Sequence, residues 1–186
     1  MPILPPEPDI YPDTLLDESE QECDSSDVWW ALYTMARREK ELMRRLRRLE
    51  IPYYCPLIKR RVRSPSGRVR VSHVPLFSSY VFLHGTNEQR QKAMTTNCIS
   101  RCLEIPDGRQ LTHDLRQIQQ LIRLDAPLTP EARLEPGERV RIRSGAMVGL
   151  EGVVIKRHGQ ERLLVAVVFL QNGASVLIED IQVEQI

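Results

Sequence analysis

Arginine side chains are the main candidates for binding chemistry in this sequence, and many of them lie in two stretches. The first stretch, residues 36–51, carries a basic face made of Arg37, Arg38, Arg44, Arg45, Arg47 and Arg48. The second flanks the sequence SPSG at 64–67 and contains Lys59, Arg60, Arg61, Arg63, Arg68 and Arg70. Guanidinium and ammonium groups neutralise phosphates whatever the base sequence. Both stretches therefore predict contacts with a nucleic-acid backbone, although a solvated charged surface would have the same composition.

The charge is unevenly distributed along the chain. Residues 1–27 hold nine acidic residues and no Lys or Arg, residues 28–126 hold 19 Lys and Arg against 8 acidic residues, and residues 127–186 hold 7 against 8. A strongly basic segment attracts polyanions, and nucleic acid is the main candidate among them. We expect residues 1–27 to be a disordered acidic tail, because they have too little apolar patterning to offset chain entropy. The tail could fold back and compete with nucleic acid, or it could simply keep the chain in solution.

Patterns typical of enzymes are weak in this sequence. Cys98 and Cys102 are spaced like half of a metal site, but no second pair or suitable histidine follows. The histidines are scattered, and no glycine-rich phosphate loop follows a strand. We therefore expect no catalytic residues, no metal and no cofactor. The enzymatic alternative is a metal-dependent nuclease.

Several features bear on the compartment. No apolar run reaches the ~18 residues that a membrane helix needs, and the start MPILPPEPDIYPD lacks the basic and apolar regions of a secretory signal. The four cysteines suit a compartment in which thiols stay reduced. We expect a cytoplasmic monomer without membrane contact.

The arginine stretches must be positioned by an α+β domain, which we place at residues 28–125. The run VWWALYT (28–34) is aromatic and β-prone, which predicts a buried strand. Residues 36–51 have leucines at i, i+4 and i+7, which predicts an amphipathic helix. Its apolar residues are Leu42, Leu46 and Leu49, with Met35 and Met43 near the same side. The turn residues of SPSG predict a hairpin with a basic tip.

Later segments complete this domain. They are a strand at 78–85, a helix at 87–97, a strand at 98–105 and a helix at 112–125 capped by Thr112. The order β-α-β-β-β-α-β-α predicts an α/β sandwich with a mainly antiparallel sheet.

The last third of the chain changes character. Residues 126–136 contain three prolines and no periodicity, which indicates a linker. Residues 137–186 form four or five short β-rich runs separated by glycines, which predicts a small all-β barrel. We expect Gly145, Gly149 and Gly152 to take turn conformations that other residues resist.

Four motifs, in this order, resemble the NusG family of transcription elongation and antitermination factors. They are VWWALYT-x-x-R-x-E (28–39), VPLFSSYVFL (74–83), GERVRIRSGAMVGLEGVV (137–154) and VVFLQNGASVLIEDIQVEQI (167–186). The resemblance implies a NusG-type N-terminal domain and an SH3-like KOW barrel. Ser78-Ser79 stands where housekeeping members have Pro-Gly. The run from Phe169 to Ser175 stands where they have a Phe-Gly-Arg turn followed by Thr-Pro. The chain therefore looks more like the specialised, RfaH-like paralogues that serve long operons.

The resemblance also implies binding residues in the N-terminal domain. In this family an apolar patch of that domain docks onto the β′ clamp helices of RNA polymerase, and the matching positions are Tyr33, Phe77, Tyr80 and Phe82. We expect Tyr33 and Phe77 on the surface, and Tyr80 and Phe82 on one face of a strand; the alternative for each is a core position. Basic side chains would then lie near upstream or non-template DNA of the transcription bubble: Arg37, Arg38, Arg44, Arg45, Lys59, Arg60, Arg61, Arg68 and Arg70.

The expected barrel has balanced charge, which favours a protein partner over nucleic acid. In the family this partner is a small-subunit ribosomal protein or the terminator Rho, and Phe169 and Leu170 are the best candidates for the contact. The resulting hypothesis is an elongation and antitermination factor that promotes processive transcription. The alternative is a KOW-containing RNA- or ribosome-binding protein without polymerase contact.

Overall fold

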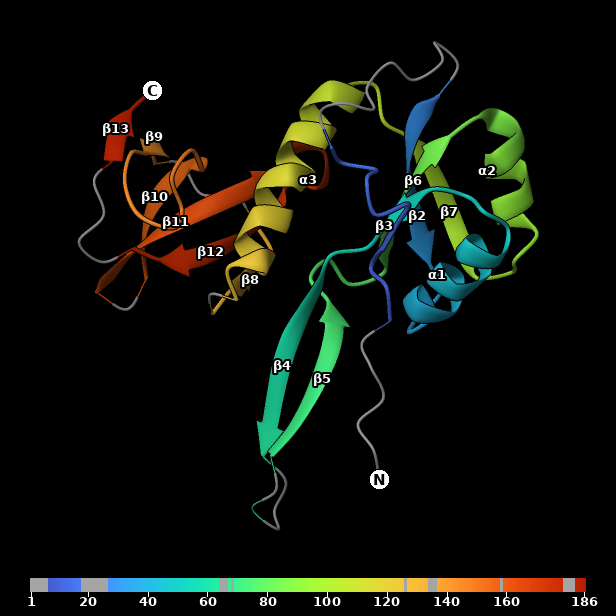
Figure 1. Ribbon diagram of the computed structural model, residues 1–186, viewed down its shortest axis with the longest axis horizontal. Coiled ribbons are helices and arrows are strands. Elements are labelled where there is room, and N and C mark those ends of the chain that lie inside the picture. The colour runs from blue at the N-terminus through green and yellow to red at the C-terminus, as the bar shows by residue number, and fades with distance from the viewer. Residues whose placement is uncertain are drawn as a thin grey trace. The chain divides into compact units, whose positions relative to one another are not determined.

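The computed structural model describes residues 7–17, 27–63, 67, 69–125, 127–133, 137–157, 159–178 and 183–186. The chain divides into two compact units, Met1–Pro106 and Asp107–Ile186. Figure 1 shows the elements of both units, which are described separately below. No helix among the described residues is long and apolar enough to cross a membrane.

A five-stranded antiparallel sheet organises the first unit, with strand order β1-β3-β6-β2-β7. Its strands are β1 (Ile10–Tyr11), β2 (Val28–Thr34), β3 (Tyr53–Tyr54), β6 (Tyr80–Gly85) and β7 (Ile99–Glu104). Strand β2 lies between β6 and β7, so the buried strand predicted over 28–34 is confirmed. Its aromatic and branched residues suit a strand whose two faces are both largely buried.

Two helices pack on one face of this sheet. They are α1 (Glu39–Arg48) and α2 (Asn87–Met94). Leu42, Met43 and Leu46 of α1 join Leu32 and Leu83 of the sheet in one buried cluster. The outer members of the expected stripe do not, because Leu49 is 45% and Met35 48% exposed. The helix is shorter than the pattern predicted, so these two residues fall outside it.

A long β-hairpin forms a second, two-stranded sheet in the same unit, as the turn residues predicted. It consists of β4 (Leu57–Arg63) and β5 (Val69–Pro75). Figure 1 shows it projecting from the rest of the unit. Residues 64–66 and 68 at its expected tip lie outside the described residues.

The expectation of disorder over residues 1–27 is wrong for residues 7–17. Strand β1 pairs with β3, with Ile10 opposite Tyr54 and Tyr11 opposite Tyr53. Ile10 is 9% and Leu16 3% exposed. Composition could not show this, because two apolar side chains and a free sheet edge are enough to anchor a short segment. Residues 1–6 and 18–26 lie outside the described residues.

The second unit combines one helix with a six-stranded antiparallel sheet of order β13-β9-β10-β11-β12-β8. Its elements are α3 (Gly108–Arg123), β8 (Thr129–Glu131), β9 (Glu138–Ile142), β10 (Glu151–Arg157), β11 (Gln160–Val167), the 3-10 turn η2 (Val168–Leu170), β12 (Asn172–Leu177) and β13 (Val183–Gln185). The β-rich character predicted for this region is confirmed. The expected linker 126–136 is not wholly irregular, because β8 pairs with β12.

Helix α3 differs from expectation in its start and in its partners. It begins at Gly108, and Asp107 caps it by accepting a hydrogen bond from the backbone N–H of Gln110 at 2.9 Å. The expected cap, Thr112, lies inside the helix and donates its hydroxyl to the Gly108 carbonyl at 2.7 Å. The helix packs against β11 and η2, within the same unit as the C-terminal sheet. The sequence had placed it with residues 28–125.

Two of the three glycines singled out from the sequence adopt positive φ, and the third has another role. Gly145 and Gly149 have φ of +84° and +83°. Gly152 lies within β10, where an added Cβ would come within 2.5 Å of the Leu164 carbonyl oxygen. Its smallness is therefore needed for close approach of two strands, not for a turn.

Candidate functional site

The turn before β6 positions the aromatic residues that the sequence selected. The backbone N–H of Tyr80 donates to the Phe77 carbonyl at 3.2 Å, which closes a four-residue turn around Ser78 and Ser79. Ser79 has φ +66°, the left-handed conformation that glycine adopts most easily. Two hydrogen bonds hold it: its carbonyl accepts from Thr34 N–H, and its own N–H donates to the Glu39 carboxylate, both at 2.8 Å.

Tyr33 and Tyr80 form an aromatic pair at the end of the sheet that this turn defines. They stand opposite each other on β2 and β6, with ring centroids 5.2 Å apart and the planes at 69°. Tyr33 is 41% exposed, and Tyr80 is half-buried. Leu103 on the neighbouring strand β7 is 40% exposed and lies on the same sheet face. An exposed edge of aromatic and apolar side chains is chemically suited to a protein partner.

Phe77 and Phe82 take a different position from the tyrosines. Phe77 is 4% exposed and Phe82 is fully buried, and their rings meet edge to face at a centroid distance of 6.4 Å. The expectation that Phe77 lies on the surface is wrong, because the turn after it directs the ring inward. For Phe82 the core alternative holds. Tyr80 and Phe82 share one sheet face, as strand alternation predicted.

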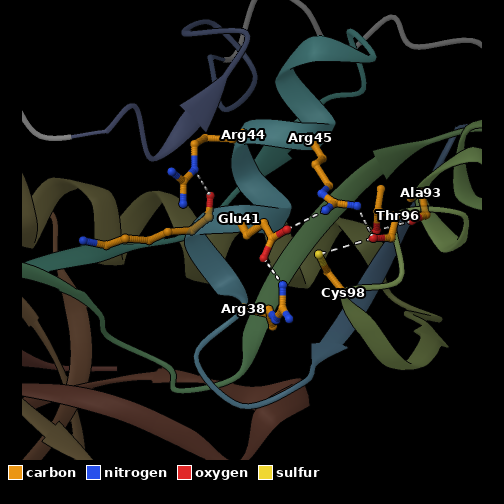
Figure 2. Close-up of polar contacts among 8 residues, drawn as sticks. Arg38, Glu41, Arg44, Arg45, Ala93, Thr96 and Cys98 are labelled. Atoms are coloured by element: carbon orange, nitrogen blue, oxygen red, sulfur yellow. Dashed lines mark hydrogen bonds and ion pairs between the residues drawn. The ribbon is translucent and has the colours of Figure 1, made fainter.

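Arg38, which precedes α1, and Arg45 of α1 are both bonded to the carboxylate of Glu41, which Figure 2 shows between them. Arg38 pairs with Glu41, and Arg45 reaches Glu41 Oε1 and the Thr96 carbonyl, each at 2.5 Å. The hydrogen bond with Arg38 is the main cause that lowers the pKa of Glu41, and the same bond raises the pKa of Arg38. Arg38 and Arg45 therefore have fewer guanidinium donors left for a phosphate than an unpaired arginine would.

The other two arginine candidates, Arg37 and Arg44, do not lie where the sequence pattern predicted. Arg37 precedes the helix with φ +60°, and its side chain is exposed. Arg44 lies on a different side of α1 from Arg45 (Figure 2). Its Nε donates to the Lys40 carbonyl at 3.2 Å and lies 3.7 Å from Glu7 Oε2. The six arginines thus do not form one continuous helix face.

Strand pairing in the hairpin places several of its basic residues on one face. Lys59 stands opposite His73, Arg61 opposite Val71 and Arg63 opposite Val69, so alternation puts these six side chains on one face. Lys59, Arg60, Arg61 and Arg63 are all exposed. Val69 is 60% and Val71 44% exposed beside them. This face offers cations with apolar surface between them. Arg68 and the side chain of Arg70 lie outside the described residues.

Phe169 and Leu170 belong to η2 and are half-buried, next to the 47% exposed Val168. Helix α3 holds this turn through a residue that the sequence did not single out. Asp114 accepts hydrogen bonds from the Val168 N–H at 2.9 Å and from Gln110 Nε2 at 2.7 Å. It is 5% exposed, and burial raises its pKa.

Two further polar residues of α3 contact the C-terminal sheet region. Gln117 accepts from the Glu151 N–H at 3.2 Å, and Gln120 donates to the Val148 carbonyl at 3.3 Å. Gln117 is buried and Gln120 is exposed. A polar residue at a position on the apolar helix face, as Gln117 is, was the available sequence signal for such a contact.

The three cysteines that the structure describes are not placed for nucleophilic chemistry. Cys98 is buried and Cys102 half-buried, and both pack in the core beneath α1 and α2. Burial raises the pKa of the Cys55 and Cys102 thiols, which keeps them protonated at neutral pH. Among the residues that the structure describes, no group of His, Cys, Asp or Glu could hold a metal ion.

Comparison with known proteins gives a family match that covers most of the first unit and most of helix α3, which follows it. The family model described as transcription termination factor nusG matches residues 27–121, just over half of the chain. No curated protein matches the chain. Members of the matched family are non-enzymatic transcription termination and elongation factors that bind RNA polymerase. The match begins just before β2 and ends within α3, and on this ground the chain belongs to the NusG family.

Proposed function

We propose that this protein is a transcription elongation and antitermination factor that binds the β′ clamp helices of RNA polymerase and favours processive elongation. The observation that carries the proposal is the Tyr33–Tyr80 pair, with Tyr33 exposed and Tyr80 half-buried, which lies within the segment matched to the NusG family. Binding that favours one state of the polymerase needs no chemistry from the protein itself. Cytoplasmic location follows from that role.

The chemistry of the tyrosine edge supports this contact. Each ring offers an apolar body and a hydroxyl, a combination enriched in interface hot spots. Arg101 is exposed and stands opposite Tyr33 on β7, so a cation borders the rings. Phe77 and Phe82 are buried, and their edge-to-face contact supports the strand that carries Tyr80. In this proposal they support the interface without touching the partner.

The basic residues are assigned to DNA of the transcription bubble. The hairpin face of Lys59, Arg61 and Arg63 is supported by exposure and register, and Arg60 projects from the opposite face. Such contacts are independent of sequence and weaken as salt rises. Arg37, Arg38, Arg44 and Arg45 are assigned to the same DNA, with Arg38 and Arg45 also paired to Glu41.

The C-terminal sheet is proposed to be a KOW barrel that recruits a small-subunit ribosomal protein or Rho. Short antiparallel strands and the positive-φ glycines 145 and 149 support this fold. The contact is assigned to Phe169 and Leu170, with the exposed Val168 beside them. The Ser78-Ser79 turn supports placement among the operon-specific, RfaH-like paralogues.

The test is binding of the full chain to purified bacterial RNA polymerase. Tyr33→Ala and Tyr80→Ala should each weaken the complex about 30-fold, the loss typical of a hot-spot residue. Met94→Ala is the matched control, because Met94 is 38% exposed on α2, away from this edge. Tight binding that survives both tyrosine changes would refute the assigned patch. A chain that binds structured RNA but no polymerase would instead be an RNA- or ribosome-binding protein.

A further inference from the structure

An arginine-lined pocket lies on α1, apart from the Glu41 cluster and the tyrosine edge. Its volume is about 340 Å³, and it is lined by Glu7, Pro8, Met43, Arg44, Arg47, Arg48 and Tyr53. Met43 and Tyr53 are each 1% exposed and supply an apolar lining. Three guanidinium groups face one carboxylate here, so the lining carries an excess of positive charge.

Glu7 is a poor partner for these arginines. Its Oε2 lies 3.7 Å from Arg44 Nε, which is beyond hydrogen-bond distance. The same oxygen is buried and has no hydrogen-bond partner among the described residues. Within the described part of the chain, Arg47 and Arg48 have no ion-pair partner, and both are exposed. The pocket therefore holds an anion whose hydrogen-bonding capacity it does not satisfy, and donors that remain available.

The segment that brings Glu7 to the pocket is anchored on the C-terminal side of that residue. Tyr53 donates its hydroxyl to the Pro8 carbonyl at 3.0 Å, and Cys55 N–H donates to the Asp9 carbonyl at 2.7 Å. Strand β1 adds only two residue pairs to the sheet edge. Burial raises the pKa of Tyr53 to about 12, so its hydroxyl remains a donor at physiological pH. Glu7 precedes the first sheet pair of this segment, Ile10 with Tyr54, so its side chain lies outside the strand pairing.

We propose that this pocket binds a backbone phosphate of nucleic acid, and that Glu7 is a built-in competitor for it. A phosphodiester presents two anionic non-bridging oxygens to Arg44, Arg47 and Arg48, whereas Glu7 makes only a long ion pair with Arg44. Arginine forks suit phosphate geometry, and charge-assisted hydrogen bonds are stronger than the long ion pair that Glu7 makes. The inference rests on the nucleic-acid contact proposed above, but it adds Arg47 and Arg48 to that surface and does not depend on polymerase binding.

The experiment measures binding of the full chain to a 20-nucleotide, fluorescein-labelled single-stranded DNA by fluorescence anisotropy over a salt series. Glu7→Gln should tighten binding about threefold at low salt, because it removes a weak ionic competitor. Arg47→Gln with Arg48→Gln should weaken binding about tenfold and reduce the log–log salt slope by about one to two. In that double-variant background Glu7→Gln should have no further effect.

Matched controls separate the pocket from general electrostatics. Asp17→Asn removes one charge from the same N-terminal segment, but Asp17 does not line the pocket. Arg109→Gln removes an exposed cation from the second unit. If Asp17→Asn tightens binding as much as Glu7→Gln, Glu7 is not a competitor in the pocket. If the Arg47/Arg48 double variant binds no worse than Arg109→Gln, the pocket is not a phosphate site.

The proposed function and the pocket inference can be refuted independently of each other. Tyr33→Ala should leave DNA affinity unchanged, and Glu7→Gln should leave polymerase affinity unchanged in the absence of DNA. Loss of the pocket effects with intact polymerase binding would remove only the inference. Absence of polymerase binding with intact pocket effects would remove only the proposed function.

Discussion

Glu39 at the start of α1 accepts a hydrogen bond from the backbone N–H of Ser79, with its Oε1 2.8 Å from that nitrogen. The two residues belong to the two N-terminal motifs that resemble the NusG family, which are separated by the whole hairpin. The bond explains why a Glu follows the aromatic strand at this spacing. It fixes the turn from which Tyr80 enters β6.

Removing the Glu39 acceptor should therefore loosen this turn. We expect Glu39→Ala to lower the free energy of unfolding by about 1–2 kcal/mol, because the Ser79 N–H loses a charged partner. Glu39→Gln should lose less, since its amide oxygen can still accept. Urea unfolding measures both, with Glu88→Ala as a control at an exposed ion pair. Equal stability of Glu39→Ala and wild type would show that the bond contributes nothing.

Ser79 itself offers a second prediction, from its positive φ. A β-branched residue resists this conformation, so Ser79→Val should cost about 2 kcal/mol of stability. Ser79→Gly should be tolerated, because glycine adopts positive φ without strain. Thermal unfolding of the two variants is the measurement. A well-tolerated valine would contradict the left-handed turn.

Among the four aromatic candidates, we expect different residues to affect stability and polymerase binding. Phe82→Ala should lower the free energy of unfolding by about 3–5 kcal/mol, because it opens a cavity in the core. Tyr33→Ala should cost less than about 1 kcal/mol, since the ring is partly exposed and loses mainly its contact with Tyr80. Denaturant unfolding, paired with the polymerase-binding assay, distinguishes the two. A strongly destabilised Tyr33→Ala would make that residue structural.

The close approach at Gly152 predicts a large effect from a single methyl group. Gly152→Ala places a Cβ 2.5 Å from the Leu164 carbonyl oxygen, which belongs to backbone and cannot rotate away. We expect a loss of about 2 kcal/mol or more in the C-terminal sheet. Gly145→Ala is the control for conformational strain alone, because open space surrounds that position. Amide hydrogen exchange in β10 and β11 would report the difference.

Asp114 predicts a pH dependence in the second unit. Its pKa is raised in the folded state by burial, so folding disfavours its ionised form. Its contribution to stability should therefore increase as pH falls through the folded pKa, and be lowest at neutral pH. Asp114→Asn should lose this dependence. The contrast is measured by urea unfolding at several pH values in a His113→Gln background, because His113 Nδ1 lies 3.7 Å from the carboxylate.

Two outcomes would contradict the prediction for Asp114. If the free-energy difference between the wild type and Asp114→Asn stayed constant across acidic and neutral pH, the carboxyl would not be held in a buried environment. If wild type lost stability relative to Asp114→Asn on acidification, the hydrogen bonds from Val168 and Gln110 would outweigh burial.

Sequence alone determined the parts of this protein that depend on local periodicity and turn chemistry. The strand from Val28 to Thr34, the hairpin around SPSG and the leucine stripe of α1 all follow from neighbouring residues, because side-chain spacing selects strand or helix directly. The order of the N-terminal motifs was also sufficient to indicate the family.

Tertiary structure decided which of the selected side chains are available. Tyr33 and Phe77 look equivalent as aromatic residues of the two motifs, but Tyr33 is 41% and Phe77 4% exposed. Arg45 and Arg44 are sequence neighbours, yet one is paired with Glu41 and the other faces Glu7. Partners brought from distant segments made these distinctions. No local pattern encodes them, because burial and ion pairing depend on where the rest of the chain lies.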